Sequence, residues 1–140
     1  MRSLLLYLWA FPASALGLVV LLMARAGGAS VRVLDGTVEV GGGRIGAAID
    51  RLPPCMRFNA ITFGHVIIGV DDALLAACRA HERVHVRQYE RWGILFFPLY
   101  LGSSLVQLAR GRSPYWDNHF ERQAYGEEPC RATADSTAQS

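Results

Sequence analysis

The sequence contains no lysine, and all 14 of its basic residues are arginine. Against 12 acidic residues they leave a formal net charge of only +2. A nucleic-acid-binding domain needs a concentrated basic surface, which this balance does not supply. We therefore expect no nucleic-acid partner. Charged residues make up 19% of the chain and apolar residues 51%, an apolar composition for a small soluble domain.

Cysteine is also scarce. The chain has three cysteines, Cys55, Cys78 and Cys130, and no two of them form a C-x-x-C pair. This spacing argues against a disulfide framework and against a cysteine-based metal site. A single bridge between Cys55 and Cys130 stays open if the domain faces an oxidising compartment.

Charge is missing altogether from residues 3–24, an apolar run of 22 residues. Such a run is long enough to cross a bilayer as a helix and predicts a single-pass membrane anchor over residues 1–26. The alternative is a cleaved signal peptide, because residues 24–26 read Ala-Arg-Ala. The run exceeds the apolar core of an ordinary signal peptide, about 7–15 residues, which favours a retained anchor. Arginine flanks the run on both sides, so charge does not assign the domain to one side of the membrane.

The segments after the anchor predict an α+β domain over residues 27–126. Residues 31–40 alternate apolar and polar side chains around Asp35-Gly36, which is typical of a β-hairpin. The expected inward-facing residues of that hairpin are Val31, Val33, Val38 and Val40. Residues 44–54 predict a short helix or turn, and residues 58–70 predict one strand because they are rich in β-branched and aromatic side chains. Residues 127–140 are polar and predict a disordered tail.

Helix signals dominate the second half of the chain. Asp71 or Asp72 caps a helix that we expect to run to about Trp92, with Gly93 ending it. A second apolar stretch covers residues 93–109. After it, Ser113-Pro114 predicts another helix, with the serine as its cap and the proline at its first helical position.

The long predicted helix carries His81-Glu82-x-x-His85, an H-E-x-x-H motif. Residues four apart share a helix face, so the two imidazoles can bind one Zn²⁺ at about 2.0–2.1 Å. Glu82 lies beside this pair, where it can take a proton from a zinc-activated water. Gln88 shares the histidine face. The competing interpretation is an exposed helix with a solvated stripe of arginines at four-residue spacing: Arg79, Arg83, Arg87 and Arg91.

A catalytic zinc site needs a third protein ligand, which leaves one position for water. The later helix offers Asp117, His119 and Glu121, and Glu121 is favoured because a helical stretch follows it and can hold it against the first helix. Asp117 could accept a hydrogen bond from a ligating histidine, and Tyr125 could donate to a developing oxyanion. The simpler roles for these two are a charge at a helix N-terminus and a packing aromatic.

Residues 81–88, H-E-x-x-H-x-x-Q, followed by residues 120–124, F-E-R-Q-A, resemble the gluzincin type of zinc metallopeptidase. They look closest to small bacterial members of that group. The resemblance implies a minimal zincin-like domain with this ligand set and base: His81, His85 and Glu121 on zinc, and Glu82 as the base. It also implies that an edge strand before the active helix, within residues 58–70, binds an extended peptide by main-chain pairing. His65 would be a residue near the site on that strand.

The second apolar stretch decides whether this site can form. A helix crossing the bilayer over residues 93–109 would place Glu121 on the opposite side from His81 and His85. The stretch lies at the lower length limit for a spanning helix, and Pro98 and Gly102 interrupt it. The zinc interpretation therefore predicts that it does not cross.

Taken together, these patterns predict a membrane-anchored, zinc-dependent metallopeptidase that acts on a peptide or protein substrate near the membrane lipid. Two alternatives stay open. One is a non-catalytic zinc-binding or scaffold protein with the same fold, and the other is a small membrane protein without metal. Zinc content separates the last alternative from the other two.

Overall fold

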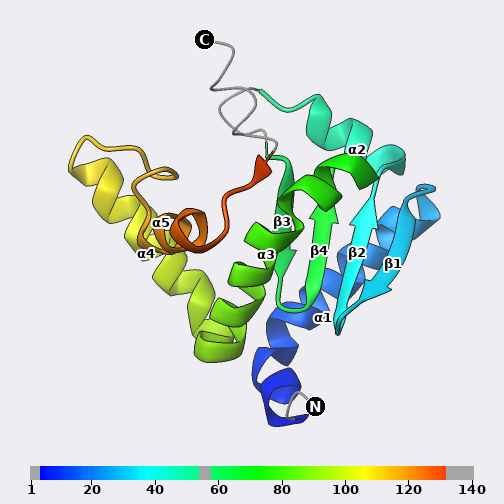
Figure 1. Ribbon diagram of the computed structural model, residues 1–140, viewed down its shortest axis with the longest axis horizontal. Helices are drawn as coiled ribbons and strands as arrows, with labels where there is room; N and C mark the ends of the chain where they lie inside the picture. The colour runs from blue at the N-terminus through cyan, green and yellow to red at the C-terminus, as the bar shows by residue number, and fades with distance from the viewer. Residues whose placement is uncertain (1–3, 54–57, 132–140) are drawn as a thin grey trace.

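The computed structural model describes residues 4–53 and 58–131. Within these ranges the chain forms an α+β fold in which helices cover both faces of a four-stranded mixed sheet (Figure 1). Helix α1 lies behind the sheet in this view, and helix α3 lies in front of it. The helices of the described ranges are α1 (Leu4–Ala26), α2 (Gly43–Asp50), α3 (Asp72–Trp92), the 3-10 turn η2 (Gly93–Leu95), α4 (Phe96–Ala109) and α5 (His119–Glu127).

The first two strands, β1 (Ser30–Leu34) and β2 (Thr37–Gly41), form the predicted antiparallel hairpin. Asp35 and Gly36 both take positive φ, 48° and 80°, as a type I′ turn requires. The expectation for the valines holds only in part. Val40 is fully buried, but Val33 is 74% exposed because β1 is an outer strand of the described sheet.

Residues 58–70 form two strands, not the single strand expected from the sequence. They are β3 (Ala60–Phe63) and β4 (Val66–Gly69), which pair antiparallel. Gly64, with φ of 60°, reverses the chain between them. The continuous run of β-branched and aromatic side chains hid this turn. In the strand order β1-β2-β4-β3, β4 lies centrally and pairs parallel with β2, whereas β3 is left at the edge.

Helix α1 is part of the folded domain rather than a separate segment in front of it. Small residues line its inner side, where Ala10, Ala13 and Ala24 are almost completely buried. Ala24 belongs to a core cluster with Val40 and Val66, whose side chains come from the sheet. In the described residues, α1 over 7–26 and the α3–α4 segment over 72–109 are both long and apolar enough to cross a membrane.

Helix α3 follows the sequence expectation closely. Asp71 caps it by accepting a hydrogen bond from the Leu74 N–H at 2.7 Å, and Gly93 ends it with φ of 57°. The arginines on this helix are not a bare solvated stripe. Arg79 makes a two-pronged ion pair with the buried Glu39, with N···O distances of 2.6 and 2.9 Å. Such pairs fix α3 against the sheet.

The chain then turns back, so that α4 and α5 pack together beside α3 (Figure 1). The buried Asn118 joins them by donating to the Tyr100 carbonyl at 3.0 Å and to Ser104 Oγ at 2.7 Å. The helix expected to begin at Ser113-Pro114 starts later. Ser113 caps only a turn, accepting from the Trp116 N–H, and Asn118 is the true N-cap of α5. Serine followed by proline fits a capped turn as well as a capped helix.

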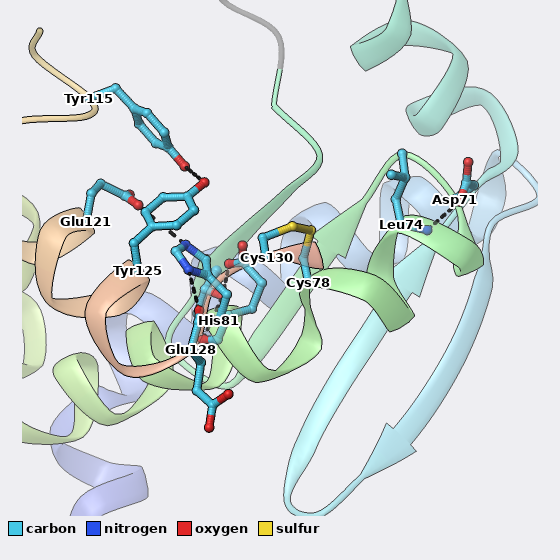
Figure 2. The surroundings of a disulfide bond; sticks show 11 residues. Asp71, Leu74, Cys78, His81, Tyr115, Glu121, Tyr125, Glu128 and Cys130 are labelled. Atoms are coloured by element: carbon cyan, nitrogen blue, oxygen red, sulfur yellow. Dashed lines mark hydrogen bonds and ion pairs between the residues drawn. A yellow bond between two sulfur atoms is a disulfide. The ribbon is translucent and has the colours of Figure 1, made fainter. Parts of the chain in front are cut away.

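The segment after α5 corrects a further expectation. A disulfide joins Cys78 of α3 to Cys130, near the start of the tail expected to be disordered, whereas residues 132–140 of that tail lie outside the described residues (Figure 2). Cys130 is therefore not bridged to Cys55, which lies outside the described residues. The bond connects positions 52 residues apart, a pairing that spacing alone could not identify.

Candidate metal centre

The structure brings His81, His85 and Glu121 together in the interior. One ligand atom from each lies within 4.8 Å of the others, and all three residues are buried. The histidines come from successive turns of α3, and Glu121 comes from the first turn of α5. Residues 93–109 do not separate them, because the return of the chain after α4 places α5 against α3.

The three side chains present acceptor atoms to one point. Glu121 Oε2 lies 3.4 Å from His81 Nε2, and Glu121 Oε1 lies 3.5 Å from His85 Nε2. Among the described residues Glu121 Oε2 has no hydrogen-bond partner although it is buried. A buried carboxylate that faces two imidazole nitrogens needs a positive charge beside it, which either a metal ion or a proton on a histidine can supply. The arrangement therefore fits a metal ion, and this buried group could hold one.

The outer nitrogen of each histidine ring has its own acceptor. His81 Nδ1 lies 3.1 Å from the Glu128 carbonyl oxygen and donates to it (Figure 2). His85 Nδ1 lies 2.8 Å from Gln88 Oε1. Gln88 Nε2 donates to the Phe120 carbonyl at 3.1 Å, which leaves its oxygen facing the histidine. Both rings are thus held with Nδ1 protonated and Nε2 directed at the cluster, the tautomer a metal ligand requires.

Electrostatics at the centre reflect its buried charges. Burial lowers the pKa of His85, but contact with Glu121 and the nearby charge of Glu82 outweigh it and raise that pKa to about 9. Burial works to raise the pKa of Glu121, but His81 and His85 hold it well below its usual range. Tyr100 on α4 also donates to Glu121 Oε1 at 2.6 Å. Without metal, a proton on His85 thus supplies the positive charge that the carboxylate faces.

Glu82 lies in the same cavity as the three candidate ligands. The Thr62 hydroxyl on β3 donates to Glu82 Oε2 at 2.8 Å and holds the carboxylate from the strand side. Thr62 and Tyr100 were not identified from the sequence, because each acts from an element whose contact with the site depends on the tertiary fold. No spacing relative to H-E-x-x-H could have revealed them.

The cavity that contains the centre has a volume of about 790 Å³. Edge strand β3 forms one wall, from Ala60 to Phe63, and the histidine face of α3 forms another. Aromatic side chains make up much of the remaining lining: Phe58, Phe96, Phe97, Tyr115, Trp116 and Tyr125. The volume is in the range of small-molecule and peptide-side-chain pockets.

Tyr125 lies directly against the candidate ligands. Its ring packs on His81 at a centroid distance of 4.3 Å, and its hydroxyl lies 3.2 Å from that of Tyr115 (Figure 2). Tyr125 therefore makes the packing contact of one sequence interpretation, and its role as a hydrogen-bond donor to substrate stays a prediction.

The other candidate residues lie away from the centre. Asp117 accepts from the Ser113 N–H at 3.0 Å, which is a turn-stabilising role, and His119 is exposed. Neither belongs to the His81–His85–Glu121 group found among the described residues. His65 is buried at the β3–β4 turn but does not line the described cavity. Its ring nitrogens lie 3.3 Å from Ser14 Oγ and 3.2 Å from Glu90 Oε1.

Comparison of the chain with models of protein families, with curated proteins and with solved structures finds no match. The function therefore has to be inferred from the geometry of the centre.

Proposed function

We propose that this protein is a membrane-associated zinc metallopeptidase of the gluzincin type. In this proposal His81, His85 and Glu121 bind Zn²⁺, and Glu82 is the catalytic base. The observation that supports it most strongly is the convergence of two Nε2 atoms and a carboxylate within 4.8 Å, with Glu82 in the same cavity. Two imidazoles and one carboxylate are a ligand set of catalytic zinc sites that keep one position open.

Zinc bound in such a site lowers the pKa of water toward about 7 and polarises a carbonyl oxygen. Glu82 would take the proton from the attacking water and pass it to the leaving amine. The Thr62 hydroxyl donates a hydrogen bond to Glu82 Oε2, so Glu82 Oε1 is the oxygen that would accept this proton. Tyr125, which lines the cavity, would donate to the oxyanion that develops on the substrate.

Strand β3 supplies a means of holding the substrate. It is the outer strand beside β4 in the described sheet, and it forms a wall of the cavity. An edge strand offers unpaired N–H and C=O groups to which an extended peptide can add as a further strand. A peptide bound in this way would lie along the wall opposite the histidine face of α3.

Zinc content tests the metal assignment first. Purified wild-type protein should retain about one zinc per chain, as three-ligand sites do, and His85→Ala should retain none. His119→Ala is the matched control, because it removes an exposed histidine outside the cluster. Wild-type protein without zinc, after zinc has been supplied, would reject the proposal.

Glu82→Gln tests catalysis separately from metal binding. It should keep zinc and lose hydrolysis of a quenched fluorescent peptide library, because the amide cannot accept the proton. Zinc-loaded wild-type protein that cleaves no peptide in this assay would leave a metal-binding scaffold as the function.

A further inference from the structure

The outer side of α1 is an exposed apolar surface that runs the length of the helix. No charged residue occurs between Leu4 and Ala24. The exposed large side chains of this surface, which we call the outer face of α1, are Leu4, Leu5, Leu8, Trp9, Phe11, Leu16, Leu18, Val19, Leu22 and Met23. Trp9 touches Gly93 of η2, where Ile94 and Leu95 are also exposed and extend the apolar surface. An exposed apolar surface that continues along a whole helix marks an interaction site.

The inner side of α1 is docked closely on the domain. A Cβ atom at Gly17 would lie 2.7 Å from the Val66 Cβ, and one at Gly64 would lie 2.6 Å from the Ser14 backbone nitrogen. A Cβ at Gly93 would lie 2.6 Å from the ring of Trp9. Three glycines thus permit close approach along the helix, which is the property of a packed core element.

Polar contacts fix the same docking. The Ser14 hydroxyl lies 3.3 Å from His65 Nδ1 and accepts from the His65 backbone N–H at 3.2 Å. The Tyr7 ring stacks on the His65 ring at 4.3 Å, and its hydroxyl donates to the Gly36 carbonyl at 3.4 Å. These are the two hydroxyl-bearing side chains of residues 4–24, and both contact the domain.

This docking conflicts with a helix that crosses the bilayer. The sheet runs beside α1 from the turn at Gly36, which contacts Tyr7, to the core near Ala24. A crossing α1 would carry the sheet to membrane depth, together with Asp35, which is 77% exposed at that turn. Exposed charges and open strand edges are excluded from the hydrocarbon region.

We propose that α1 lies in the plane of a lipid bilayer, with its outer face embedded in the membrane surface and the domain above it. The occupant is lipid rather than a second protein, because protein interfaces carry polar groups at their rim, whereas the only polar group among the large side chains of the outer face of α1 is the indole N–H of Trp9. Arg25 and Arg44 are exposed near the end of the helix, where they can contact anionic headgroups. A helix that lies in the membrane surface with an apolar face embedded in it is a known physical mode of membrane attachment.

The inference does not depend on the metal centre. It replaces the single-pass anchor expected from the sequence with an in-plane one, and it makes α1 a lasting part of the folded protein. Its core contacts through Ala10 and Ala13 would be lost if residues 1–26 were removed.

The side of the membrane on which each end of the chain lies in cells tests the in-plane orientation of α1. The full chain would carry one epitope at the N-terminus and another at the C-terminus, and proteases would be applied to spheroplasts and to inverted membrane vesicles. An in-plane α1 predicts that both epitopes are cleaved in the same preparation. Cleavage of the two epitopes in opposite preparations would show that α1 crosses and would overturn the proposal.

Vesicle flotation tests the surface itself. Purified protein should float with phosphatidylglycerol–phosphatidylethanolamine vesicles, and the double variant Leu8→Arg/Leu22→Arg should lower its partition coefficient at least about tenfold. Ala76→Arg/Ala80→Arg adds the same charge at exposed positions of α3, across the sheet, and should not lower it. Thermal unfolding followed by circular dichroism checks that each variant is folded. Absence of flotation, or equal flotation of wild type and the Leu8/Leu22 variant, would overturn the proposal.

Discussion

Gln88 fixes the orientation of His85. The two side chains lie one turn apart on α3, and Gln88 Oε1 accepts from His85 Nδ1 at 2.8 Å. The glutamine amide nitrogen in turn bonds to the Phe120 carbonyl on α5 and to Gln123 Oε1. One residue therefore sets the histidine tautomer and also connects the face of α3 that carries the candidate ligands to the helix that carries Glu121.

Gln88→Ala should weaken zinc binding about 10–100-fold, the usual effect of removing the partner of a ligating histidine. Competition with a chelator of known zinc affinity measures this. Gln123→Ala provides the control, because Gln123 is exposed, contacts the far end of the Gln88 amide and otherwise donates to Glu127, so it does not touch His85. An equal loss of affinity in both variants would contradict a specific role for the His85 contact.

Thr62→Val should lower kcat about tenfold while leaving zinc content unchanged, because outer contacts of a catalytic group typically have effects of this size. The variant keeps the β-branched shape of the strand residue and removes the hydroxyl that holds Glu82. Thr62→Ser keeps the hydroxyl and should restore activity. A valine variant with full activity, or a serine variant as slow as the valine one, would show that Thr62 does not position the base.

The local parts of the fold were predictable from the sequence, since their signals lie within a few residues. Asp35-Gly36 identified a hairpin, and Asp71 or Asp72 identified a helix cap; the structure confirms the hairpin and assigns the cap to Asp71. The turn at Gly64 was missed because a single glycine in an apolar run did not look like a turn. The start of α5 was misplaced because Ser113-Pro114 is compatible with a turn or a helix.

The candidate site was likewise predictable only where its signals are local in the sequence. The histidine pair could be found because helix periodicity alone places His81 and His85 on one face. The approach of Glu121 depends on the return of the chain after α4, which no local pattern specifies. The carbonyl of Glu128 was beyond prediction, because every residue has a carbonyl and only the tertiary fold selects one.

The raised pKa of His85 predicts opposite pH dependences for stability and for metal binding. Its pKa of about 9 in the metal-free fold exceeds the ordinary 6.5, so its contribution to stability is fully present below pH 6.5 and is lost as pH rises through 9. Zinc must displace the same proton, so zinc affinity should rise with pH, about tenfold per unit below pH 9. Denaturant unfolding of metal-free protein and chelator-buffered zinc titrations at several pH values measure the two slopes. Zinc affinity that stays constant from about pH 6.5 to 8.5 would contradict the assignment of that proton to a ligand.

The disulfide predicts a link between covalent structure and the metal centre. Cys130 follows the Glu128 carbonyl by two residues, and its bond to Cys78 holds this segment on α3 (Figure 2). Removing a bond that closes a loop of this length costs up to about 4 kcal/mol in the free energy of unfolding. The double variant Cys78→Ser/Cys130→Ser should show that loss in denaturant unfolding.

The same double variant should also bind zinc several-fold more weakly, because the acceptor for His81 Nδ1 is no longer held in place. The Glu128 N–H still donates to the Ala124 carbonyl at 2.8 Å, so the effect should be smaller than that of Gln88→Ala. Cys55→Ser serves as the control, since it removes a cysteine outside the bond. If the double variant is less stable but binds zinc with wild-type affinity, the disulfide stabilises the fold only. The contact between His81 and the Glu128 carbonyl is then maintained by α5 alone.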